Sequence, residues 1–106
     1  MLEAKEKTKD SYAKAKPLFE RIQDYRGEAA YYLGMGNLVE GKTDMALEKM
    51  QKAVKLGFTK AMYELGKIYM SKKNYSEAEK WFLQSEKQGE MQATERLTEI
   101  YNIERN

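Results

Sequence analysis

The chain has 106 residues, 34% of them charged, and a formal net charge of only +2. This length corresponds to one domain or to a piece of a longer array. The small net charge gives no large field of one sign, which argues against charge-driven binding to nucleic acid or to a membrane surface. No apolar run approaches the roughly 20 residues that a membrane-spanning helix needs.

The sequence contains neither histidine nor cysteine. Their absence excludes structural zinc sites and the Ser-His and Cys-His nucleophile arrangements. We therefore predict no catalytic residue, no metal site and no cofactor, in a protein that is not an enzyme. Residues 1–16 alternate charge with alanine and lack the apolar segment of a secretory signal. We expect a cytoplasmic protein, and export within a longer precursor stays open.

Good helix formers dominate the chain, and apolar residues recur at intervals of three and four. In chain order we predict six helices, at about 8–25, 28–40, 44–56, 60–72, 76–88 and 91–104. The predicted connections are short, so neighbouring helices should run antiparallel.

The first predicted helix contains the single proline of the chain, Pro17. The helix therefore either begins near this residue, with proline in its first turn, or is kinked there. Its repeat signal is poor, and we expect it to cover the N-terminal end of the helical stack with Tyr12, Leu18, Phe19 and Ile22.

Glycine follows three of the predicted helices, at Gly41, Gly57 and Gly89. A left-handed residue closes many helices, and glycine adopts that conformation without a side-chain penalty. The polar residues expected to cap the helices that follow are Thr43 or Asp44 for the third helix and Asn74 or Ser76 for the fifth.

The chain resembles itself at an offset of 32 residues. A fixed period of this length predicts stacked helical hairpins, and such stacks form an extended surface more readily than a catalytic pocket. The match continues more weakly in the last helix, with Tyr101 answering Tyr69. The strongest correspondences are Ala29, Leu33, Gly34, Ala46 and Gly57 with Ala61, Leu65, Gly66, Ala78 and Gly89.

Two stretches of the sequence resemble the signature of Sel-like repeats. Residues 53–61, followed by Leu65-Gly66, form the first stretch, and residues 85–93, followed by Leu97, form the second. Trp81-Phe82 stand where that family places paired aromatic residues. From about residue 27 to residue 101 the chain therefore resembles the Sel-like repeat family, a relative of the tetratricopeptide (TPR) repeats.

The chain departs from that pattern at several positions. Asn37 replaces an expected tyrosine, Lys49-Met50 replace the aromatic pair of the first unit, and Thr98 replaces glycine in the last. The resemblance implies an all-α fold, a short right-handed α-solenoid of antiparallel helical hairpins. Within the single domain 1–106 it implies an N-terminal capping helix at 1–27, repeats at 28–57 and 60–89, and a C-terminal half-repeat at 91–104.

Members of such families are scaffolds or adaptors that bind a peptide or protein on the concave face, which the first helix of each unit lines. The resemblance therefore implies a protein or peptide partner for this chain. The last helix would show Gln92, Glu95, Glu99 and Asn102 on that face. The partner-binding residues implied by position are Glu28, Tyr31, Met35 and Leu38 in the first unit and Lys60, Tyr63, Lys67 and Met70 in the second.

Each of these residue types also has a purely structural interpretation. Tyrosine and methionine at helical spacing fit a packed core, and lysine fits ordinary surface charge. Trp81 and Phe82 are expected to be packing residues. The Gly34-Met35-Gly36 segment lacks the third glycine of a dinucleotide fingerprint and is expected to mark a close helix crossing.

The C-terminal helix carries Leu97, Ile100, Tyr101 and Ile103. Some of these side chains should pack back on the preceding hairpin, and we expect Ile100 and Ile103 to remain uncovered. Three explanations stay open for such a surface: a homodimer through the C-terminal helix, continuation of a longer array, or binding of a partner.

The function that the sequence predicts is a non-catalytic protein–protein interaction module, with a partner that is neither nucleic acid nor membrane. Two alternatives stay open. One is a small immunity or inhibitor protein that blocks a toxin, and the other is a self-associating assembly domain.

Overall fold

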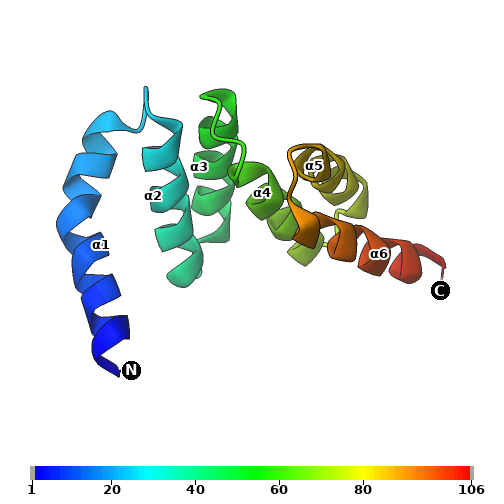
Figure 1. Cartoon of the computed structure of the whole chain (residues 1–106), viewed down its shortest axis with the longest axis horizontal. Coiled ribbons are helices and arrows are strands. Elements are labelled where there is room, and N and C mark those ends of the chain that lie inside the picture. The colour runs from blue at the N-terminus through cyan, green and yellow to red at the C-terminus, as the bar shows by residue number, and fades with distance from the viewer. Residues whose placement is uncertain (1, 106) are drawn as a thin grey trace.

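The computed structural model describes the backbone of residues 2–105 and the side chains of residues 10–105. Met1, which the predicted capping segment includes, lies outside the described residues. The described chain forms six helices and no strand, and each helix packs against the next one, as Figure 1 shows. The predicted all-α helical stack is thus confirmed. The helices are α1 (Leu2–Ile22), α2 (Gly27–Val39), α3 (Thr43–Lys55), α4 (Ala61–Ser71), α5 (Tyr75–Lys87) and α6 (Met91–Arg105).

Helices α2 to α6 begin and end within one residue of the predicted bounds. Helix α1 differs, because it begins six residues earlier and ends three residues earlier than predicted. It runs through Pro17, so the expectation of a helix that begins at this proline was wrong. The alanine, lysine and glutamate residues that precede Pro17 favour helix strongly enough to continue it past the one missing backbone donor. None of the helices described here is long and apolar enough to span a membrane.

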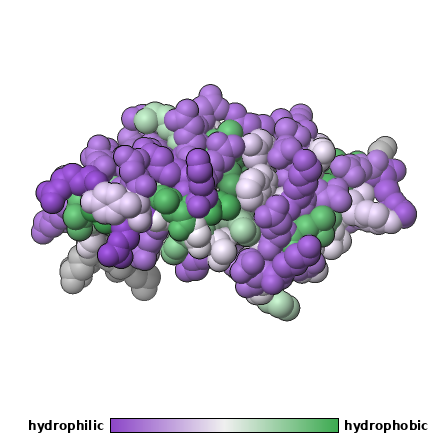
Figure 2. Space-filling model, turned by 90° about the horizontal axis from the view of Figure 1, so that it is seen from above, coloured by the Kyte–Doolittle hydropathy of each residue, from purple (hydrophilic) through white to green (hydrophobic). Residues whose placement is uncertain are grey.

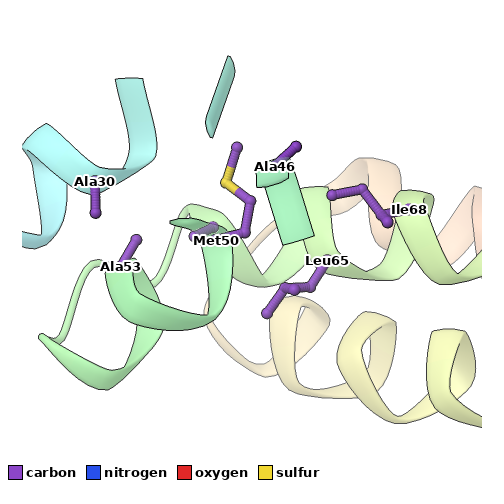
Figure 3. Packing of buried hydrophobic residues seen from close by; sticks show 7 residues of the cluster. Ala30, Ala46, Met50, Ala53, Leu65 and Ile68 are labelled. Atoms are coloured by element: carbon purple, nitrogen blue, oxygen red, sulfur yellow. The ribbon is translucent and has the colours of Figure 1, made fainter. Parts of the chain in front are cut away.

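The first hydrophobic core lies between α2, α3 and α4. Ala30 and Ala53 face one another from α2 and α3, and Met50 fills the space beside them (Figure 3). A β-carbon added at Gly34 would lie 2.9 Å from the terminal methyl group of Met50. The missing side chain therefore allows α2 and α3 to approach closely. The buried members of this core are Ala30, Ala46, Met50, Ala53, Ala61, Leu65 and Ile68.

The second core repeats this arrangement between α4, α5 and α6. Gly66 stands 32 residues after Gly34, and a β-carbon there would lie 2.5 Å from the ring of Phe82. Phe82 in turn stands 32 residues after Met50, so each hairpin pairs a glycine with one large apolar side chain. Phe82 is fully buried and Trp81 packs half-buried on the first core, as expected of packing residues. The second core contains Tyr63, Ala78, Phe82, Ala93 and Ile100.

The predicted left-handed glycines are confirmed. Gly41, Gly57 and Gly89 have φ angles of 76°, 90° and 93°, each just after a helix. Helix α4 ends in the same way, but the left-handed residue there is Lys73, with a φ of 61°. The backbone N–H of Asn74 donates to the carbonyl of Tyr69 at 2.9 Å, which closes the turn as in a glycine-terminated helix.

One of the two predicted helix caps is present. Asn74 caps α5, since its side-chain oxygen accepts a hydrogen bond from the backbone N–H of Glu77. The cap expected for α3 from Thr43 or Asp44 was wrong. That helix begins at Thr43, one residue before the predicted start, and the preceding residue, Lys42, provides no side-chain cap. Asp44 instead forms an ion pair with Lys72 at the end of α4.

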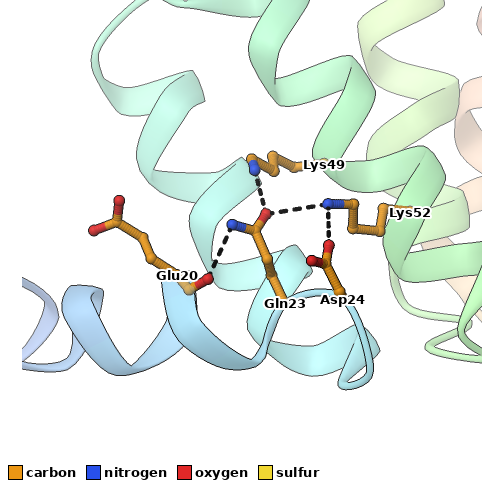
Figure 4. A network of polar contacts seen from close by, with 5 residues as sticks. All are labelled: Glu20, Gln23, Asp24, Lys49 and Lys52. Carbon is orange, nitrogen blue, oxygen red and sulfur yellow. Dashed lines mark hydrogen bonds and ion pairs between the residues drawn. The ribbon is translucent and has the colours of Figure 1, made fainter.

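Helix α1 is held to the stack by polar and aromatic contacts. At its C-terminal end, the amide oxygen of Gln23 accepts hydrogen bonds from Lys49 and Lys52 of α3, and Lys52 also pairs with Asp24 at 2.8 Å (Figure 4). Burial, followed by the charge of Lys52, lowers the pKa of Lys49.

Further along α1, Phe19 stacks on Tyr32 of α2 with ring centres 5.3 Å apart. Tyr12 packs so closely on Gly36 that a β-carbon there would overlap the phenol. Burial raises the pKa of Tyr12. Leu18, which was expected to cover the stack, is instead half exposed, because the face of α1 that meets α2 carries Tyr12 and Phe19.

The C-terminal helix packs more completely than expected. Ile100 is only 2% exposed and belongs to the second core, so the expectation that it remains uncovered was wrong. Its side chain follows Ala93 by two helical turns and therefore lies on the same face of α6. Ile103 is 45% exposed, as predicted.

Candidate functional site

The eight residues predicted to bind a partner lie on, or one residue before, helices α2 and α4, the first helices of the two hairpins. They differ in accessibility. Glu28, Lys60 and Lys67 are exposed, Tyr31, Met35, Leu38 and Met70 are half-buried, and Tyr63 is buried. The exposed and half-buried side chains remain available to a partner at least in part, whereas the ring of Tyr63 is a packing group.

Tyr31 belongs to an aromatic cluster at the start of α2. Its ring lies 5.0 Å from that of Phe58, in the turn before α4, and 5.4 Å from that of Tyr32. Burial raises the pKa of the Tyr31 phenol, and the negative charges of Glu64 and Glu90 add to this effect. Tyr31 is therefore a neutral phenol at physiological pH, with a polar hydroxyl on an apolar ring, a combination suited to partner contacts.

Tyr63 occupies the position equivalent to Tyr31 but has a different environment. Glu90 stands where Phe58 stands one unit earlier, so no ring is present at that place. The Tyr63 ring packs on Phe82 instead, with centres 5.7 Å apart, and only 8% of the residue is exposed. Its hydroxyl accepts a hydrogen bond from Arg96 Nε at 3.1 Å. Tyr63 thus joins α4 to α5 and α6.

A buried carboxylate lies beside Tyr63. Glu64 is almost fully buried, and its Oε2 lies 3.1 Å from Lys67 Nζ. The lysine approaches outside the hydrogen-bond direction, so this contact is an ion pair without a formed hydrogen bond. Lys67 Nζ also lies 5.0 Å from the centre of the Tyr63 ring, a cation–π contact. The lysine head group is therefore held over α4 by two neighbours.

Helix α6 completes the group with Arg96, which bonds Tyr63 and also pairs with Glu99 at 2.8 Å. The hydrogen bond to Tyr63, followed by that to Glu99, raises the pKa of Arg96. We call Tyr63, Glu64, Lys67, Arg96 and Glu99 the α4–α6 polar cluster. Its two cations and two carboxylates balance, which favours neither an acidic nor a basic partner.

Sequence reasoning missed two members of this cluster, Glu64 and Arg96. Both stand one residue after the stripe that was predicted to face the partner, and they are equivalent to each other at the 32-residue offset. A charged residue between Tyr63 and Leu65, in the middle of an apolar stretch, was the available signal for Glu64, because a buried charge requires a partner.

The chemistry of the face is that of a recognition surface. No group of three or more acidic residues that could hold a metal occurs in the described part of the chain. The face combines half-buried phenol and thioether groups with fixed charges, and such groups suit contacts with another polypeptide.

Neither the collection of protein families nor that of curated proteins contains a match to the sequence. Among solved structures, the crystal structure of MamA, a TPR-like protein, matches with a TM-score of 0.72 and 25% sequence identity. The match covers 76% of this chain and 50% of that one, so the chain corresponds to half the length of MamA. The more specific Sel-like assignment stays a prediction. The six helices of this chain form a TPR-like helical repeat fold.

Proposed function

We propose that this chain is a non-catalytic protein–protein interaction module that binds a peptide or protein segment along the concave face lined by α2, α4 and α6. The observation that carries the proposal is the recurrence of accessible side chains at 32-residue intervals on the first helices. Met35 and Lys67 form one such pair, and Glu28 and Lys60 form another.

The fixed orientation of these groups supports the proposal. Lys67 is held by Glu64 and Tyr63, and Tyr31 is held by Phe58, so little side-chain entropy is lost when a partner binds. The TPR-like fold is generally non-catalytic and suggests protein partners.

The test compares two triple variants after a partner has been isolated by affinity capture and purified. The first variant neutralises the exposed charges of the face, Glu28→Gln, Lys60→Gln and Lys67→Gln. The matched control makes the same chemical changes on α3 and α5, where Glu48, Lys55 and Lys80 are equally exposed.

Calorimetry on the purified partner should show binding by the first variant weakened by about tenfold or more, which is about 1.4 kcal/mol. The control should bind as the parent protein does. Equal loss in both variants, or loss in the control alone, would show that α2, α4 and α6 do not form the binding face. Circular dichroism verifies that all three proteins are equally helical.

A further inference from the structure

A groove of about 180 Å³ opens between α5 and α6, at the C-terminal end of the stack. Its apolar walls include Leu83, which is 42% exposed, and Tyr101, which is 53% exposed, and Glu79 and Glu104 stand among the lining residues. Figure 2 shows a hydrophobic patch toward the end of the molecule that carries α5 and α6. The groove contains neither Tyr31 nor Lys67, so it is separate from the face proposed above.

The internal repeat shows what fills the equivalent place one unit earlier. Leu97, Ile100 and Tyr101 correspond to Leu65, Ile68 and Tyr69 of α4, at the offset of 32 residues. In the interior of the stack, Leu65 and Ile68 are buried and Tyr69 is half-buried. All three belong to the core against which α5 packs Trp81.

Helix α6 lacks the second helix that completes the two earlier hairpins. Helix α2 is paired with α3 and α4 with α5, each through a glycine crossing. The position equivalent to Gly34 and Gly66 is Thr98 in α6, and it is exposed. The groove is therefore the place where a second helix would lie in a complete third hairpin.

The two second helices show which side chains such a helix needs. In α3, the buried residues Ala46, Met50 and Ala53 follow one another at intervals of four and three. In α5, the equivalent residues are Ala78, Phe82 and Ser85. A helix that fits this place carries a small residue, a large apolar residue four positions later and another small residue three positions after that.

From this correspondence we infer that the α5–α6 groove docks one amphipathic helix of a partner protein, with this small–large–small pattern and with basic residues on its flanks. The basic flanks follow from Glu79 and Glu104. A second copy of the chain is a poorer occupant, because both of its helices with this pattern, α3 and α5, are already buried in its own hairpins.

The probe is a capped synthetic peptide with the sequence of residues 43–55, which carries the pattern together with three lysines and two acidic residues. The comparison peptide has the Met50 side chain replaced by aspartate. In a titration of isotopically labelled full-length protein, the first peptide should shift the amide resonances of residues around Leu83 and Tyr101. The second should bind at least about tenfold more weakly, because a charge then enters an apolar groove.

Protein variants locate the site. The double variant Leu83→Ser and Tyr101→Ser should weaken the peptide by about tenfold or more. The matched double variant Val39→Ser and Met45→Ser removes two equally exposed apolar side chains from α2 and α3 and should leave binding unchanged. Both variants alter exposed positions, so both should remain folded.

A charge exchange provides an independent readout. The double variant Glu79→Lys and Glu104→Lys should weaken the residue 43–55 peptide and strengthen a peptide with the more acidic sequence of residues 75–87. The inference is overturned if neither peptide binds, or if binding depends on Lys67 and not on Leu83. It is equally overturned if sedimentation shows a dimer that the Leu83→Ser and Tyr101→Ser variant dissociates.

Discussion

Two glycines at equivalent positions make the helix crossings of this protein, but their neighbours differ. The space beside Gly34 is occupied by the flexible end of Met50, whereas the rigid ring of Phe82 lies against Gly66. A methyl group added at each position therefore meets different resistance. Methionine can rotate away, and a buried phenylalanine cannot do so without moving a helix.

We expect Gly66→Ala to lower the free energy of unfolding by about 1–3 kcal/mol, the usual cost of overpacking a core. Gly34→Ala should change it by less than about 1 kcal/mol, because the higher helix propensity of alanine offsets the displacement of Met50. Urea unfolding followed by circular dichroism measures both values. Adding Phe82→Met to Gly66→Ala should restore part of the lost stability; equal costs for the two alanine variants would contradict this account.

At the scale of the helix, the ends of α2 and α4 provide a second natural comparison. Gly41 and Lys73 are equivalent residues in the same left-handed conformation, with φ angles of 76° and 61°. Lysine pays a steric cost there that glycine avoids. Both positions are exposed, and no other residue lies within 4 Å of a β-carbon built at Gly41, so packing does not enter the comparison.

The substitution Lys73→Gly should therefore stabilise the protein by about 0.5–1 kcal/mol, and Gly41→Lys should destabilise it by about 1 kcal/mol. Thermal unfolding of the two variants and the parent protein checks the signs. A destabilised Lys73→Gly variant would mean that the lysine side chain makes a stabilising contact that outweighs its backbone strain.

Ion pairs between elements make stability depend on acid. The hydrogen bond and charge of Lys52 lower the pKa of Asp24, and those of Lys72 lower the pKa of Asp44. Because the folded state holds both carboxylates ionised at a pH where the unfolded chain begins to bind protons, this stabilisation is present above the ordinary pKa of 3.8. It is lost as the pH falls through the lower, folded-state values.

We expect the urea midpoint to decrease between neutral pH and about pH 3, and less so in the double variant Asp24→Asn and Asp44→Asn. Both carboxylates are fully exposed, so added salt should reduce the difference between the two proteins. An identical acid response in the two proteins, at low salt, would rule out these ion pairs as its source.

At the scale of the whole molecule, the stack measures 45 × 34 × 25 Å, and its helices have neighbours on one side or on both. Helices α3 and α4 lie in the middle and supply most of the first core. Helix α1 lies at one end and is held by the Phe19–Tyr32 stack and by the contacts of Gln23 and Asp24. In a linear array of this kind, local stability should follow the number of neighbours.

Hydrogen exchange of the native protein should therefore be fastest in α1 and slowest in α3 and α4. The reason is that opening an end helix breaks one interface, whereas opening a middle helix breaks two. Exchange measured residue by residue checks the order. Uniform protection from α1 to α6 would show that the stack unfolds as a single cooperative unit.

The sequence by itself determined the repeating architecture. The 32-residue offset, the helix periodicity and the terminal glycines all depend on local geometry, so five helices were predicted to within one residue. Helix α1 was predicted less well because Pro17 is a local signal for a helix start or a kink, and the helix formers on either side outweigh it.

Only the tertiary structure decided how individual side chains are used. Tyr31 and Tyr63 are equivalent in sequence, yet one remains half-accessible beside Phe58 and the other is buried on Phe82 and bonded to Arg96. The difference comes from residues on other helices, which the local pattern does not contain. For the same reason the burial of Glu64 and the groove between α5 and α6 emerge only when neighbouring helices are packed together.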